Sequence, residues 1–285
     1  MQLGEIKMQT IGIVGLGLIG GSLAKAFKFS EKVRVLALDK NHFTTEIAKM
    51  SDFIDDSLEG KISECDFVFL AIGAEDTVEF VKKNAKEFKK NGIVVDCAGV
   101  KGIVCEPCFK IAKEYGFNFI GGHPMAGTQF SGLKYSKQDL FVGANMVLCP
   151  KHNEDINILK NVKDILKIAG FTSVSITTPE KHDEVIAFTS QLAHVVSNAY
   201  VKSPNALIHK GFSAGSYKDL TRVAWLNEDM WASLFLNNKK NISYEIKHII
   251  NELEKYDKAI ENNDFETLKN LLKEGREQKE KCDKE

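Results

Sequence analysis

The chain has 285 residues, which is enough for two domains with hydrophobic cores of their own. Its formal net charge is −1 with 27% charged residues, so the composition predicts no nucleic-acid partner and no attraction to an anionic membrane. There is no secretory signal and no run of about 18 apolar residues. The six cysteines lack the pattern of a secreted disulfide framework, and Cys105 and Cys108 lack the second pair that a zinc site requires. We therefore expect a cytoplasmic protein without a metal site.

The first predicted element is a glycine-rich turn between a strand and a helix. A short β-branched strand at residues 11–14 leads into Gly15, Gly17 and Gly20, which form a G-x-G-x-x-G pattern, and a helix follows over residues 18–29. The first glycine permits a tight turn, the second lets a pyrophosphate approach the backbone, and the third lets the helix pack close to the strand. The N-terminus of this helix offers N–H groups and a positive dipole end to an anion.

A second strand, at residues 33–38, ends at Asp39. A carboxylate at this place accepts hydrogen bonds from a ribose diol and repels a 2′-phosphate, which favours NAD over NADP. The neighbouring Lys40 could tolerate a phosphate, so NADP stays the less favoured alternative. The predicted cofactor-binding residues are Gly15, Gly17, Leu18, Ile19, Gly20, Asp39, Ala71, Gly73 and Thr77.

Strands and helices go on alternating as far as residue 178, which is typical of an α/β doubly wound parallel sheet. The further strands are expected at residues 66–72, 93–97, 117–120, 144–148 and 171–177, and the further helices at 44–50, 76–88, 102–115 and 154–169. We therefore assign residues 9–178 to a dinucleotide-binding domain.

Residues 179–285 show almost only helical periodicity. Helices are predicted at residues 181–201, 219–226, 229–237 and 241–279, the last with a break at 262–264. About a hundred helical residues often lack a complete core of their own, so we expect this all-helical domain to form a homodimer through its apolar stripes.

Residues 121–132, GGHPMAGTQFSG, interrupt the alternation and are predicted to form a loop at the carboxyl edge of the sheet, where such sheets bind ligands. This segment contains His123, whose imidazole can take a proton from an alcohol while hydride leaves the same carbon. The pattern fits equally well a histidine that only bonds its own loop.

Six motifs together identify a family resemblance. They are GLGLIGGS at residues 15–22, VDCAGVKG at 95–102, GGHPMAGTQFSG at 121–132, HDEVIAFTSQLAH at 182–194, GSYKDLTRVA at 215–224 and MW at 230–231. In this order they resemble the prephenate dehydrogenases, and the resemblance covers nearly the whole chain. It implies a Rossmann-type domain followed by a helical dimerisation domain. It also implies NAD(P)-dependent oxidative decarboxylation of prephenate to 4-hydroxyphenylpyruvate in tyrosine biosynthesis.

The resemblance also assigns roles to particular residues. His123 matches the histidine that bonds the ring 4-hydroxyl, and Arg222 matches the arginine that binds a substrate carboxylate. His182 matches a histidine near the active site. The implied substrate-binding residues are Gln129, Ser190, His194, Gly215, Lys218, Arg222 and Trp231, with Trp231 at the pocket rim.

The chain departs from the family pattern at several positions. Gly99 replaces a serine that touches the substrate hydroxyl in many members, which leaves His123 to act alone or with water. Gln191 and Ala193 replace a histidine and a proline, and Gln129 stands where several members carry an acidic residue. An arogenate ammonium would favour a carboxylate at that position, so Gln129 favours prephenate.

Three alternatives to a prephenate dehydrogenase remain open from the sequence. The first is the same chemistry on arogenate. The second is a reductase that combines a Rossmann-type and a helical dimer domain, of the pyrroline-carboxylate or 3-hydroxyacid type. The third is an NAD-sensing module without turnover, against which His123 argues.

Overall fold

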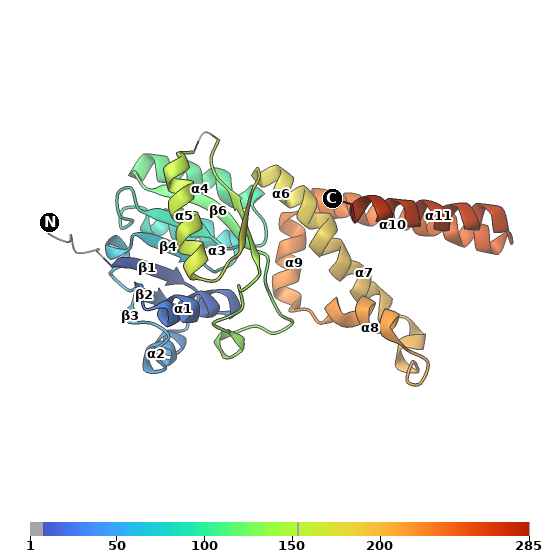
Figure 1. The fold of residues 1–285 in the computed structure, drawn as a ribbon, viewed down its shortest axis with the longest axis horizontal. Coiled ribbons are helices and arrows are strands. Elements are labelled where there is room, and N and C mark those ends of the chain that lie inside the picture. The colour runs from blue at the N-terminus through green and yellow to red at the C-terminus, as the bar shows by residue number, and fades with distance from the viewer. Residues whose placement is uncertain (1–7, 153, 285) are drawn as a thin grey trace.

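The computed structural model describes residues 8–152 and 154–284. Its N-terminal half holds an eight-stranded sheet in the order β3-β2-β1-β4-β5-β6-β7-β8 (Figure 1). The strands are β1 (Gln9–Val14), β2 (Val33–Leu38), β3 (Asp56–Ser57), β4 (Phe67–Leu70), β5 (Ile93–Asp96), β6 (Asn118–Pro124), β7 (Asn145–Cys149) and β8 (Ser173–Ile176). Strands β3 to β6 pair in parallel, so their carboxyl ends meet at one edge.

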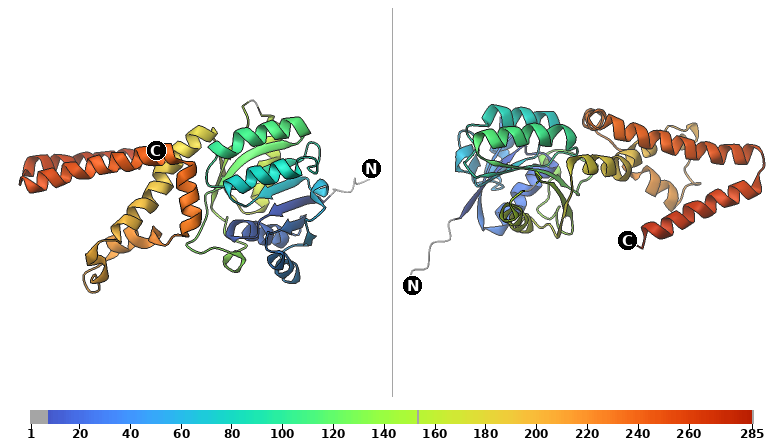
Figure 2. Two further views of the ribbon diagram at one scale, coloured as in Figure 1. Left: turned by 180° about the vertical axis from the view of Figure 1, so that it is seen from behind. Right: turned by 90° about the horizontal axis from the view of Figure 1, so that it is seen from above.

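Helices cover both faces of the sheet, as Figures 1 and 2 show. They are α1 (Leu18–Ser30), α2 (His42–Met50), α3 (Ala74–Asn84), α4 (Gly102–Tyr115) and α5 (Ile156–Ile168). Alternate residues of β4 enter two different cores: Phe67 and Phe69 pack with α1 and α5, and Val68 and Leu70 pack with α3 and α4. A strand with two buried faces must be apolar throughout, which is why these strands carry no polar alternation. The predicted α/β doubly wound fold is therefore confirmed.

The C-terminal part of the chain is helical and extends away from the sheet (Figures 1 and 2). Its helices are α6 (Pro179–Ile186), α7 (Ala193–Tyr200), α8 (Gly215–Thr221), α9 (Glu228–Asn237), α10 (Lys239–Glu261) and α11 (Phe265–Cys282). Asn263 has a positive φ of 51°, and the carboxylate of Asp264 accepts the Thr267 N–H over 3.0 Å. This turn and N-cap separate α10 from α11, so the predicted break at residues 262–264 is confirmed.

Three features differ from the sequence-based expectation. Strand β7 runs antiparallel to β6 and pairs in parallel with β8, so the sheet is only mostly parallel. The antiparallel ladder extends β6 as far as Pro124 and pairs His123 with Val147, so His123 lies on a strand and not in a loop. The helix predicted at residues 181–201 contains a π-helical segment, Ala187–Leu192, between α6 and α7. Hydrophobic periodicity does not encode strand direction or a one-residue helical bulge, which explains these differences.

None of the helices in the part of the chain that the structure describes is both long and apolar enough to cross a membrane.

Candidate active site

The glycine-rich turn is shaped for an anionic ligand. Gly15 has a φ of +89°, and a Cβ there would lie 2.6 Å from the carbonyl oxygen of Ala71. A Cβ at Gly20 would lie 1.8 Å from the carbonyl oxygen of Gly15, so only glycine lets α1 approach the turn this closely. A Cβ at Gly17 would meet nothing within 4 Å. Gly17 therefore borders open space at the N-terminus of α1, whose first turn carries no acidic residue.

Asp39 lies directly after β2 and connects the end of this strand to the glycine-rich turn. One carboxylate oxygen accepts the Leu16 N–H over 2.7 Å, and the other accepts the Asn41 N–H over 2.9 Å. Thr77 in the first turn of α3 is fully buried, and its hydroxyl oxygen has no hydrogen-bond partner among the described residues. A buried hydroxyl without a partner is unfavourable unless a ligand supplies one. The open space at Gly17, the placement of Asp39 and the free hydroxyl of Thr77 together fit a dinucleotide.

A chain of three polar side chains lies at the carboxyl end of β6. The Nδ1 atom of His123 lies 2.9 Å from Nε2 of His182, at the start of α6. The Nδ1 atom of His182 in turn lies 2.7 Å from a carboxylate oxygen of Asp183. His182 and Asp183 are buried, and His123 is half-buried. His123 was expected to act alone or with water. This expectation is wrong for its Nδ1 atom, because His182 is the partner of that atom.

The surroundings of His123 keep it neutral. Burial is the main cause that lowers its pKa well below the usual value, and the electrostatic effects of His182 and of the Lys101 ammonium lower it further. Lys101 is fully buried; its ammonium donates to the carboxylate of Asp96 and, over 2.7 Å, to the carbonyl oxygen of Gly122. The Asp96–Lys101 pair therefore fixes the backbone next to His123. A neutral imidazole is the form that can accept a proton.

Helix α9 forms a wall that connects His123 with His194. A Cβ at Gly99 would lie 3.1 Å from a methyl carbon of Leu234 and 3.8 Å from Nε2 of His123. Trp231, one turn earlier on α9, packs its ring 3.9 Å from the ring centroid of His194. Residues three apart in a helix are about 4.5 Å apart along the axis. Helix α9 therefore comes close to His194 through Trp231 and to the Gly99 side of His123 through Leu234.

Helix α9 is also bonded to the start of α3. The amide of Asn237 donates to the carboxylate of Glu75 over 2.6 Å, and the Ser233 hydroxyl donates to it over 3.3 Å. The Asn237 amide is the main cause that lowers the pKa of Glu75. Since α3 follows its N-cap residue Gly73 beside the glycine-rich turn, these bonds connect the α9 wall to the predicted cofactor site.

Three of the predicted substrate-binding residues line one open hollow of about 560 Å³ in the helical part of the chain. They are Ser190, His194 and Arg222, and Asp219 lies among the other lining residues. Ser190 belongs to the π-helical segment, whose wider turn is a common feature of functional sites. The Nδ1 atom of His194 lies 2.8 Å from the Val223 carbonyl oxygen, and burial is the main cause that lowers the pKa of this ring. Nε2 of His194 is therefore left to accept a hydrogen bond.

The structure does not bring all of the predicted substrate residues to His123. Gly215 and Lys218 belong to the short helix α8, which packs against α7 and lies apart from the sheet (Figure 1). Both residues are exposed, as is Gln129 in the segment after β6. Among the described residues no hydrogen bond, ion pair or ring contact joins any of these three to His123.

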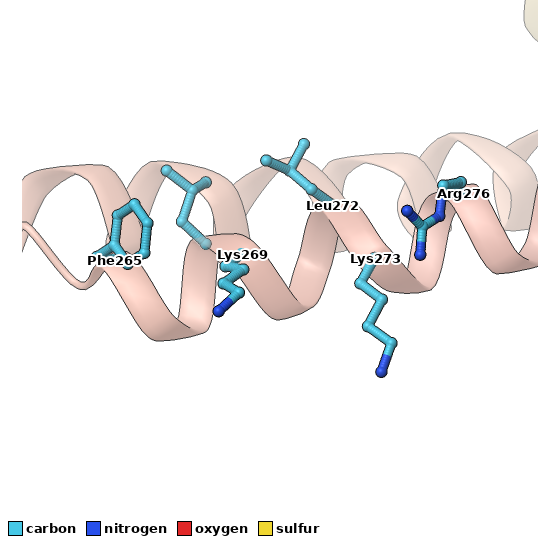
Figure 3. Close-up of a pocket in the computed structure, with 6 residues that line it drawn as sticks. Phe265, Lys269, Leu272, Lys273 and Arg276 are labelled. Atoms are coloured by element: carbon cyan, nitrogen blue, oxygen red, sulfur yellow. The ribbon is translucent and has the colours of Figure 1, made fainter.

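A second hollow, of about 470 Å³, lies along α11 between Phe265 and Arg276 (Figure 3). Its lining combines apolar side chains with Lys269, Lys273 and Arg276. It contains no predicted site residue. In the part of the chain that is described, no group of three or more metal-ligating side chains lies close enough together to hold a metal ion.

Sequence reasoning left Asp183 and Asn238 out of the site. Asn238, between α9 and α10, donates to the Asp183 carbonyl oxygen over 2.8 Å and to the Gln191 side-chain oxygen over 2.9 Å. Asp183 follows His182 directly in the sequence, which is the one local signal that could have pointed to it. Asn238 has no comparable signal, because its partners lie 55 and 47 positions away.

A dinucleotide-binding sheet with a neutral histidine at its carboxyl edge, followed by a helical domain, defines a nicotinamide-dependent oxidoreductase of the Rossmann type. Residues 23–175 match the family model described as prephenate dehydrogenase, nucleotide-binding domain, and residues 178–274 match prephenate dehydrogenase, dimerization domain. The chain belongs to the prephenate dehydrogenase family.

Similar proteins agree with this membership. The prephenate dehydrogenase of Bacillus subtilis (strain 168) is 31% identical over 91% of this chain and 72% of its own length. The crystal structure of prephenate dehydrogenase from Aquifex aeolicus, in complex with hydroxyphenyl propionate and NAD+, is 31% identical with a TM-score of 0.84 and covers 98% of this chain and 99% of that one. The crystal structure of Synechocystis arogenate dehydrogenase is 25% identical with a TM-score of 0.80, over 96% of this chain and 100% of that one.

Proposed function

We propose that this protein is an NAD-dependent prephenate dehydrogenase that converts prephenate to 4-hydroxyphenylpyruvate and CO2. The observation that supports this most directly is the neutral His123 at the carboxyl edge of the sheet, with its Nε2 atom toward Gly99 and the α9 wall. The family membership and the relative solved with hydroxyphenyl propionate and NAD+ support the substrate class and the cofactor.

The glycine-rich turn, the N-terminus of α1, Asp39 and Thr77 would hold NAD+, which when bound accepts a hydride from C4 of the substrate. His123 accepts the proton of the C4 hydroxyl through Nε2 as C4 becomes a ketone carbon. The bond from the ring to its carboxylate then breaks, and the electron pair moves through the ring to the ketone oxygen. His123 returns its proton to that oxygen, so the step releases CO2 and leaves a phenol with no net change in protons.

The other charged residues hold the acid groups of the substrate. Prephenate carries two carboxylates, and Arg222 can bind one of them through two parallel N–H bonds. His194 and Ser190 share the hollow with Arg222 and offer further hydrogen bonds. Lys218 supplies a second positive charge four positions earlier in the sequence. Since decarboxylation needs one carboxylate to leave as CO2, we place Arg222 on the side-chain carboxylate, which stays.

We also propose that two copies of the chain form a homodimer through residues 179–285, with the domain junction after residue 178. The helical part exposes large apolar side chains: Phe212 is 93% exposed, Leu207 88%, Trp225 73% and Phe265 71%. Large exposed apolar side chains of this kind are unfavourable in water, and a second copy would cover them. The free cysteines of the described residues fit a reducing compartment, so we place the protein in the cytoplasm.

Arogenate is the second candidate substrate, favoured by the similarity to Synechocystis arogenate dehydrogenase. We propose that Gln129 favours prephenate, because its amide can donate to a keto or carboxylate oxygen but offers no charge to an ammonium group.

The test is a matched assay of NADH formation from prephenate and from arogenate, each with NAD+ and with NADP+. We expect the highest kcat/KM for prephenate with NAD+. We further expect Gln129→Glu to raise the ratio of arogenate to prephenate turnover. The His123→Asn variant serves as the control for catalysis: it should bind NAD+ normally and lose turnover on the order of 10²-fold. No turnover of either substrate would reject the proposed function, and an unchanged ratio in Gln129→Glu would reject the role of Gln129.

A further inference from the structure

The carboxylate of Asp183 is held at the N-terminus of α4. One oxygen accepts the Lys101 N–H over 2.8 Å, and the other accepts the Gly102 N–H over 2.8 Å. A Cβ at Gly102 would lie 2.9 Å from the second oxygen, so glycine is needed for this approach. Asp183 is 5% exposed. The two backbone N–H groups therefore fix both the position and the orientation of the carboxylate.

This fixed carboxylate determines where the protons lie on both histidines. A carboxylate only accepts hydrogen bonds, so Nδ1 of His182 carries the proton in the 2.7 Å contact with Asp183. When the His182 ring carries this one proton, its Nε2 is the acceptor in the 2.9 Å contact with His123. Consequently Nδ1 of His123 carries its proton, and its Nε2 keeps a free lone pair. That atom is the one beside Gly99 and the α9 wall.

We propose that His182 and Asp183 are positioning residues, which hold His123 in the single tautomer that can accept a proton from the substrate hydroxyl. This inference rests on the proposed function, because it concerns the proton acceptor of that reaction. The residues come from two parts of the fold: His123 lies on β6, whereas His182 and Asp183 lie on α6. The catalytic histidine thus acquires its reactive tautomer only when α6 is docked against the start of α4.

The remaining charged neighbours leave this arrangement intact. Lys101 approaches from the segment before α4, but its ammonium is paired with Asp96 at the end of β5. On the other side of α6, the Asn238 amide donates to the Asp183 carbonyl oxygen and so holds the backbone of Asp183. Among the described residues, His182 is therefore the only side chain that hydrogen-bonds a ring nitrogen of His123.

Two substitutions at His182 separate this role from a merely structural one. His182→Leu introduces an apolar side chain of similar size and removes the acceptor for His123, while Asp183 retains its two backbone donors. His182→Gln restores an amide that can donate to Asp183 and accept from His123. The matched control is Glu184→Gln, since Glu184 is exposed and forms a surface ion pair with Lys181 across 2.9 Å.

We expect His182→Leu to lower kcat with prephenate at least about 10-fold while the KM values for prephenate and NAD+ stay near wild type. His182→Gln should recover most of the lost kcat, and Glu184→Gln should match wild type. Equal losses in His182→Leu and His182→Gln, or a loss confined to KM, would overturn the proposal.

A second measurement reads the tautomer directly. The ¹⁵N NMR signals of His123, identified by their absence in His123→Asn, should show a protonated Nδ1 and a bare Nε2 in the wild-type enzyme. They should change toward a protonated Nε2 in His182→Leu. A wild-type ring protonated on Nε2, or an unchanged ring in His182→Leu, would overturn the inference. If the NMR result is as expected but neither prephenate nor arogenate is turned over, the proposed function fails and the hydrogen-bonded chain stands.

Discussion

Two alanine substitutions in the glycine-rich turn should have different effects on stability and the same effect on cofactor binding. At Gly20 the new Cβ would lie 1.8 Å from the carbonyl oxygen of Gly15. Because an ordinary contact between these atoms is about 3 Å or longer, α1 has to move away by more than about 1 Å. Overpacking of this kind costs about 1–3 kcal/mol or more. At Gly17 the Cβ would meet nothing within 4 Å, and its φ of −72° suits alanine. The change in the free energy of unfolding should therefore stay within about 1 kcal/mol.

Thermal unfolding and NAD+ titration together test this reasoning. For a domain of this size, about 1 kcal/mol corresponds to a change in Tm of about 2–4 °C. We expect Gly20→Ala to lower Tm by about 4 °C or more and Gly17→Ala to leave Tm nearly unchanged. Both variants should bind NAD+ at least about 10-fold more weakly, because Gly17→Ala fills the open space assigned to the pyrophosphate. Normal NAD+ binding by Gly17→Ala, or an unchanged Tm in Gly20→Ala, would refute the assignment.

Three further outcomes are expected. Asp39→Ser should narrow the preference for NAD+ over NADP+, because it removes the carboxylate that repels a 2′-phosphate. The measurement is the ratio of the kcat/KM values for the two cofactors. A wild-type enzyme that prefers NADP+ would contradict the role of Asp39. Arg222→Ala should raise the KM for prephenate strongly and lower kcat less, because it mainly removes substrate binding; an unchanged KM would exclude Arg222 as the carboxylate ligand. The free energy of unfolding should fall between about pH 7.5 and about pH 5.5, because burial lowers the pKa of His123 in the folded protein and the unfolded chain takes up that proton first. Urea unfolding at both pH values measures this fall, which should be smaller in His123→Asn.

The sequence by itself predicted the order of the elements and the nucleotide-binding turn. The spacing of Gly15, Gly17 and Gly20 and the apolar runs of the strands are local properties, and local backbone geometry follows from them. Helix α4 begins and ends at the predicted residues 102 and 115 for the same reason. The predicted placement of His123 at the carboxyl edge also follows, because a parallel sheet brings the ends of its strands to one edge.

The tertiary structure alone determined how the predicted residues are connected. The contact between His123 and His182 joins residues 59 positions apart, and the bond from Lys101 to Asp183 spans 82 positions. No periodicity encodes such pairs, since they depend on how α6 docks against the sheet. The antiparallel direction of β7, the π-helical segment and the distance of α8 from His123 were likewise absent from the sequence pattern. The chemistry of His123 depends on its neighbours in space, and only packing between the two parts of the fold supplies them.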